Sequence, residues 1–250
     1  SAYVWSICHN IVHHTYTNVL GKDHDIGYGV MRMTRGQEWE PRFLFNVPLG
    51  IVLSTGFEWL LSLQRLELEK LIDGRKSVKQ VYAESKNLRK KMLRQFGKDY
   101  VFFPLIAGPM FLPVLAGNAV ANLIRNYWSS AVIYCGHFTE DAEMFTEAEC
   151  ENESKADWYL RQLMGSSNLE GGKWFHIMSG NLSHQIEHHM FPDIPANRYA
   201  ELAVEVKALC EKYDLPYNTG TLSKQFGTVV KRIFRLSLPS TNQNGTPAVA

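Results

Sequence analysis

The sequence lacks several features that would place it in common protein classes. Its four cysteines form no CxxC pair, which excludes a disulfide framework and indicates free thiols in a reducing compartment. It has no excess of positive charge, with 26 basic against 25 acidic residues, so no nucleic-acid partner is expected. It shows no signal peptide, internal repeat or strand pattern, and we expect an all-α protein.

Two long apolar stretches, residues 43–63 and 100–124, are present despite a mean hydropathy of -0.20. Each is long enough to cross a bilayer as a helix, and three prolines should kink the second. Two crossings return the chain to the side it left. The loop between them is basic, so the positive-inside rule would place the loop in the cytoplasm and the histidines outside. We favour histidines in the cytoplasm, where electrons from NADPH are available. Two alternatives stay open: buried helices of a soluble protein, or a shallow 43–63 with a tight hairpin within 100–136.

Six of the nine histidines form two triplets of the same spacing, His9-x3-His13-His14 and His184-x3-His188-His189. On a helix, residues i and i+4 share a face, so each triplet presents stacked imidazoles with a third beside them. Imidazole suits zinc, copper, iron and nickel. No cysteine accompanies the triplets, which argues against a structural thiolate zinc site. The pattern predicts metal binding.

The residues around the triplets resemble the second and third histidine boxes of the membrane fatty acid desaturases. The first triplet continues as TYTN and then KDHD, and the second stands in NLSHQIEHHMFP. The likeness is strongest to bacterial NADPH-dependent stearoyl-CoA desaturases and extends over residues 1–238. The first box of that family is absent, and we expect it upstream of Ser1. We therefore expect the 250-residue chain to be inactive by itself.

The resemblance implies a centre of two iron ions that activates dioxygen as co-substrate. His184 and its neighbour Gln185 compete for the first position of the third box, and His184 is favoured because it stands four residues before His188. The implied metal ligands are His9, His13, His14, His137, His184, His188 and His189. Of these, His9, His13, His14, His188 and His189 are the implied catalytic residues.

The resemblance also implies the reaction and its partners. The expected substrate is a long-chain acyl-CoA, converted from stearoyl-CoA to oleoyl-CoA. Electrons would come from NADPH through a separate reductase of ferredoxin or flavin type. The expected protein is a multi-pass helical protein of the cell membrane, in contact with lipid, with a histidine-rich cap facing the cytoplasm. Residues 1–238 would form part of the desaturase domain and 239–250 a disordered tail.

Two other functions use similar residues. A membrane di-iron hydroxylase or ketolase would carry the same boxes. A histidine-rich metal transporter would need ionisable residues along its spans, where only Glu58 occurs.

Further residues fit supporting roles. Asp23, Asp25 and Glu187 are candidates for orienting the imidazoles. The acidic stretch 140–153 would either dock a basic electron donor or form a solvated loop. Aromatic side chains suited to an acyl tunnel are Trp5, Trp128, Trp174 and Phe175.

Overall fold

The computed structural model describes residues 8–64, 66, 70–71 and 74–239, which are mostly helical. They divide into two compact units. Residues 51–129 make the first unit, and residues 8–50 with 130–239 make the second. The predicted tail beyond Pro239 and the proposed tunnel residue Trp5 lie outside the described residues.

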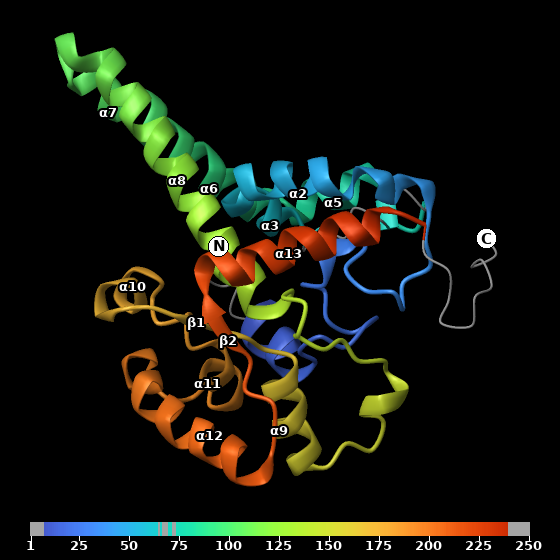
Figure 1. The fold of residues 1–250 in the computed structure, drawn as a ribbon. Coiled ribbons are helices and arrows are strands. Elements are labelled where there is room, and N and C mark those ends of the chain that lie inside the picture. Colours follow the sequence, from blue (N-terminus) through green and yellow to red (C-terminus); the bar gives the residue numbers. More distant parts are fainter. Residues whose placement is uncertain (1–7, 65, 67–69, 72–73, 240–250) are drawn as a thin grey trace. The chain divides into compact units, whose positions relative to one another are not determined.

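The first unit is built on a helical hairpin (Figure 1). α6 continues through a π-helix, Gly97–Phe102, into the short α7, and the chain reverses at Gly108, whose φ of 55° favours glycine. α8 then returns beside α6, and Asn118 Nδ2 donates a hydrogen bond to the Asp99 carbonyl at 2.6 Å. The helices with residues in this unit are α2 (Asn46–Thr55), α3 (Phe57–Gln64), α5 (Val78–Glu84), α6 (Lys86–Phe96), α7 (Phe103–Ile106) and α8 (Phe111–His137).

Neither predicted span is a single membrane-crossing helix. Among the residues that the structure describes, no helix combines the length and the apolar character needed to cross a membrane. The stretch 43–63 divides between a 3-10 turn, α2 and α3. The stretch 100–124 contains the reversal of the hairpin, because the left-handed turn at Gly108 ends one helix before the next begins. The predicted alternative placed the whole hairpin within 100–136, whereas its first arm begins with α6 at Lys86.

The second unit packs short helices around the histidines. An apolar core in this unit is formed by buried side chains on α9, α11 and α12, with Ile186 of α11 fully buried. Its elements are a π-helix (Cys8–His13), the end of α8, α9 (Lys155–Met164), β1 (Asn168–Glu170), α10 (Lys173–Met178), α11 (Gln185–Met190), α12 (Tyr199–Tyr213), β2 (Thr219–Thr221) and α13 (Leu222–Ser237).

The helical fold class is confirmed in the main, and two short strands add to it. β1 and β2 pair in parallel, with Asn168 opposite Thr219 and Glu170 opposite Thr221. Three residues are too few for an alternating pattern to appear in the sequence, and parallel pairing joins segments far apart in the chain. Of the longer helices in this unit, α12 buries Val206 and Cys210 on one face.

Candidate metal centre

The first histidine triplet is carried by a π-helix. His9 and His13 lie in the π-helix Cys8–His13, whose hydrogen bonds close over five residues, and His14 follows directly after it, so the three rings face one side. The His9 and His13 rings stack with centroids 4.7 Å apart, and His14 meets His9 edge-on at 5.1 Å. All three side chains are buried. The wide turn thus brings the third imidazole nearer to the other two than an α-helix would.

The second triplet is split by the start of α11. The helix begins at Gln185, so His188 and His189 lie on it while His184 precedes it in a non-helical conformation. The His184 ring stacks instead on His176, with centroids 4.5 Å apart. The structure therefore places His184 outside the cluster formed by the other implied ligands, because the i, i+4 relation to His188 requires a helical His184.

His13, His137 and His189 come together from three separate elements. Their side chains are at most 2% exposed. The His137 Nε2 atom lies 3.3 Å from His13 Nε2 and 3.1 Å from His189 Nε2. One ring nitrogen from each residue lies within 4.8 Å of the others, which is a spacing that a single metal ion can bridge.

The outer nitrogens of these three rings are bonded to acceptors. His13 Nδ1 donates to the Asp23 carboxylate at 2.8 Å, and His189 Nδ1 donates to the Gln162 side-chain oxygen at 3.2 Å. His137 Nδ1 approaches the Gly165 carbonyl at 3.4 Å. Each acceptor favours a proton on Nδ1, which leaves a lone pair on Nε2. In the neutral rings these lone pairs point at one another and repel, and a cation between them relieves that repulsion.

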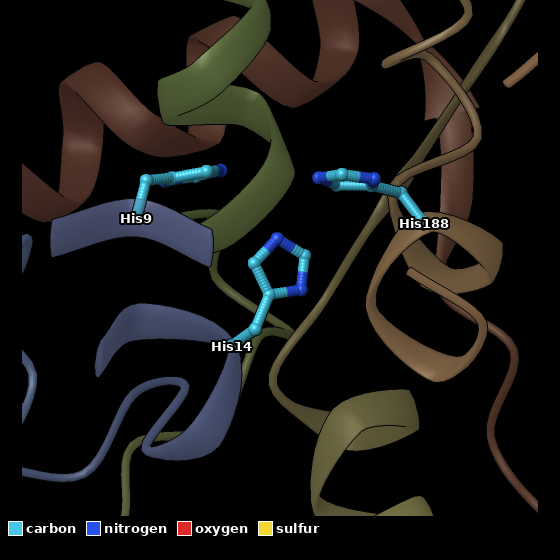
Figure 2. A group of neighbouring side chains, drawn as sticks. All are labelled: His9, His14 and His188. Carbon is cyan, nitrogen blue, oxygen red and sulfur yellow. The ribbon is translucent and has the colours of Figure 1, made fainter. Parts of the chain in front are cut away.

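A second group of three histidines adjoins the first. Figure 2 shows the rings of His9 and His188 pointing toward each other from two elements, with His14 between them. Their ligand nitrogens also lie within 4.8 Å of one another. His188 Nε2 is buried without a hydrogen-bond partner, while its Nδ1 lies 3.1 Å from the Tyr199 hydroxyl. A buried, unpartnered imidazole nitrogen fits a metal ligand.

The two groups of histidines are in direct contact. The His14 and His189 rings stack at 4.4 Å, and His9 stacks on His13 at 4.7 Å. Asp25 lies beside both groups, with its Oδ2 3.3 Å from His9 Nδ1 and 3.7 Å from His13 Nδ1. The arrangement offers two neighbouring all-histidine sites.

Electrostatics keep most of these imidazoles neutral, the form that binds metal. Burial, followed by the neighbouring histidines, lowers the pKa of His14 to about 2 and that of His188 to about 3. Burial also holds the pKa values of His137 and His189 well below the usual range. His13 is the exception: burial opposes its charge, but the nearby carboxylates of Asp23 and Asp25 outweigh it and raise the pKa.

Three residues other than histidines and carboxylates support the cluster, and of these only Gln185 was predicted, as the alternative to His184. Gln185 Nε2 lies 3.0 Å from His137 Nε2, so the neighbour of His184, and not His184, approaches the cluster. Gly136 makes room for it, since a Cβ there would lie 2.8 Å from Gln185 Cγ. Gln162 belongs to no motif, and only the packing of α9 brings it to His189.

The predicted supporting carboxylates divide into two groups. Asp23 and Asp25 contact imidazoles of the cluster. Glu187 turns away, and its carboxylate accepts hydrogen bonds from Asn168 and Tyr217. Burial raises the pKa of Glu187.

The other predicted surfaces are only partly supported. In the acidic stretch 140–153, the Glu140 carboxylate accepts hydrogen bonds from Lys231 and Arg235. Glu153 pairs with Arg161 in the same way, so part of the stretch is neutralised. Trp174 is 79% exposed, which does not fit a tunnel wall.

Fold and site together define a mostly helical protein with a buried cluster of histidines that could hold metal, and comparison with known proteins supplies the family. A profile of the fatty acid desaturases matches residues 1–221. The NADPH-dependent stearoyl-CoA 9-desaturase of Mycobacterium tuberculosis is 46% identical over 94% of this chain and 56% of its own length. The sn-1 linoleoyl-lipid 6-desaturase of Synechocystis is 29% identical over 87% of this chain and 62% of its own. The acyl-lipid (8-3)-desaturase of Mortierella alpina is 24% identical over 86% of this chain and 49% of its own length.

The chain belongs to the fatty acid desaturase family. It spans just over half the length of the Mycobacterium relative. No solved structure matches it.

Proposed function

We propose that this chain forms the histidine-bearing part of an oxygen-dependent fatty acyl desaturase with two iron ions. The observation that carries the proposal is the convergence of three buried Nε2 atoms, from His13, His137 and His189, whose Nδ1 atoms face acceptors. The second group, with the unpartnered His188 Nε2, provides for a second ion. All-nitrogen donors with supporting carboxylates suit iron among the metals that imidazole binds.

Bound iron would supply the oxidising power that removal of two hydrogens from an unactivated methylene pair requires, which no side chain can supply by itself. The chain's own residues prepare the site. Asp23 holds the proton on His13 Nδ1, and Gln162 holds the one on His189 Nδ1, so both Nε2 atoms face inward. Burial of the rings excludes bulk water, which would otherwise quench a strong oxidant.

The substrate and electron source follow from the named relatives. The Mycobacterium relative is a stearoyl-CoA 9-desaturase that depends on NADPH. We infer the same class of substrate, a long-chain acyl-CoA desaturated at carbon 9, with electrons from NADPH delivered by a separate reductase.

We further propose a location in the cell membrane. The tip of the hairpin exposes a run of large apolar side chains that water would not favour. The opposite end of α6 is basic, and the positive-inside rule assigns that end to the cytoplasm. We propose that the histidines also face the cytoplasm, because NADPH, on which the Mycobacterium relative depends, is available there. The exposed apolar residues at the tip are Val101, Phe102, Leu105, Ile106, Met110 and Leu112.

The test is product analysis with the complete polypeptide. It would be expressed with a competent reductase in a host that lacks its own desaturase, and the fatty acids would be identified by mass spectrometry. We expect a new double bond at carbon 9 of stearoyl chains, and its loss in His189→Ala. His24→Ala is the matched control, since His24 is an exposed histidine. Hydroxylated products alone would refute the desaturase assignment.

A further inference from the structure

α13, which begins directly after β2, presents three different faces. Its first face packs into the second unit and is formed by Gln225, Val229, Ile233 and Leu236, of which Val229 is fully buried. This face already satisfies the packing of the helix. The remaining surface of α13 is therefore free to serve another purpose.

The second face is an exposed apolar stripe. Phe226, Val230 and Phe234 follow one another on the helix at intervals of four residues and are 40%, 46% and 58% exposed. Residues four apart lie on one side of a helix, so these side chains form a continuous row. A single exposed apolar residue needs no explanation, but a row of three indicates a partner.

The third face is basic and borders the stripe on the side away from the core. Lys224, Lys231 and Arg235 recur at helical spacing and lie together. Glu140 accepts hydrogen bonds from Lys231 and Arg235, so one carboxylate is shared by two of the three cations. An excess of positive charge remains next to the apolar row.

The orientation of α13 is fixed by its neighbours. The Arg232 guanidinium donates to the carbonyls of Thr139 at 2.6 Å and Ala142 at 3.1 Å. At the end of the helix, Trp39 Nε1 donates to the Ser237 carbonyl at 3.0 Å. These bonds oppose rolling of the helix, so the apolar stripe cannot turn inward to escape water.

We infer that α13 lies on the surface of a bilayer that contains anionic phospholipid, with the stripe among the upper acyl chains and the basic row against the headgroups. An apolar face beside a row of lysine and arginine is the pattern of helices that lie in the membrane interface. Negative headgroups complement the basic row. The inference rests on the proposed membrane location, and adds a second point of contact, on the unit that holds the histidines.

α12 of the same unit provides a contrast. It exposes Val204 at 70%, but the charged residues around it are of both signs: Glu201, which pairs with Arg198 at 2.7 Å, Glu205 and Lys207. This face of α12 therefore has no excess of positive charge to attract anionic headgroups. Val204 is therefore the matched control for an exposed aliphatic side chain that does not meet lipid.

The experiment places an environment-sensitive fluorophore at single cysteines in the complete polypeptide, reconstituted into phosphatidylglycerol nanodiscs. Val230→Cys and Phe234→Cys report on the stripe, Val204→Cys is the control, and Leu112→Cys reports on the hairpin. Lipids with a nitroxide near the top of the acyl chain should quench the two stripe positions by about half and leave position 204 unchanged. Quenching should weaken in phosphatidylcholine discs, and also in a Lys224→Gln, Lys231→Gln background.

The outcomes separate this inference from the proposed membrane location. Quenching at position 112 without quenching at 230 and 234 would overturn the inference for α13 and leave the membrane location standing. Blue-shifted emission at 230 and 234 without lipid quenching would mean that protein covers the stripe, which also overturns it. Equal quenching in the two lipids would overturn the choice of an anionic surface. Absence of quenching at all positions would refute both proposals.

Discussion

Replacing Asp23 with asparagine should weaken metal binding without unfolding the protein. The carboxylate is buried and serves three donors: Oδ2 accepts from His13 Nδ1 at 2.8 Å and from the Asn18 amide at 2.9 Å, and Oδ1 accepts from the Asp25 amide at 2.9 Å. Asparagine has the same shape but only one acceptor oxygen. In any orientation its NH2 group faces a donor, and the negative charge that fixes the proton on His13 Nδ1 is lost.

The size of the effect follows from the charge-assisted bond to His13. A hydrogen bond to a charged group contributes about 1.5–3 kcal/mol. Since about 1.4 kcal/mol corresponds to a tenfold change in an equilibrium constant, we expect iron affinity to fall about ten- to a hundredfold. This matches the effect that removal of a carboxylate partner has at other histidine-bound metals.

The assay is an iron titration of the complete, metal-stripped polypeptide, with circular dichroism to verify the fold. Asp25→Asn is the matched control. Its carboxylate lies farther from the imidazoles, at 3.3 and 3.7 Å, and its side chain is 15% exposed against 1% for Asp23. In the Asp25→Asn control, iron affinity should fall by less than about tenfold. A folded Asp23→Asn protein with unchanged iron affinity would refute the role of this carboxylate.

Two further predictions concern α8 and pH. Gly136→Ala should push Gln185 away from His137 and lower activity severalfold, because the added Cβ would lie 2.8 Å from Gln185 Cγ. Gly117→Ala in the same helix, where a Cβ meets nothing within 4 Å, should leave activity unchanged, and equal losses in both variants would argue against a specific clash. Without metal, the protein should lose stability as the pH falls from 6.5 toward 3. His14 and His188, with pKa values of about 2 and 3, resist protons that the unfolded chain accepts near its ordinary value of 6.5. A melting temperature of the metal-free protein that stays constant over this pH range would contradict the conclusion that His14 and His188 are neutral in the folded protein.

The sequence was most informative where the chemistry lies in short motifs. The two triplets predicted the gathering of His9, His13, His14, His188 and His189, because the metal groups need several imidazoles close in space and helical spacing supplies them in clusters. His137 joins the centre from the end of α8. Its place was suggested only by resemblance, since a lone histidine carries no pattern of its own.

The sequence was less informative where packing between distant parts of the chain determines which residues meet and where a helix begins or ends. His184 stands at the right spacing, but α11 starts one residue later, and a helix boundary is not visible to that accuracy. Gln162 and Gly136 act through contacts between elements far apart in the chain. The apolar length of 100–124 suggested one span, whereas the turn at Gly108 produces a hairpin, because apolar content does not reveal where a helix reverses.

The iron content of the purified complete polypeptide, compared among three proteins, tests the centre most directly. The two histidine groups predict about two iron ions per chain in the unmodified protein. His184→Ala should retain both, because His184 stacks on His176 outside the cluster, whereas His189→Ala should lose at least one. Loss of iron in His184→Ala with full retention in His189→Ala would contradict the proposed centre.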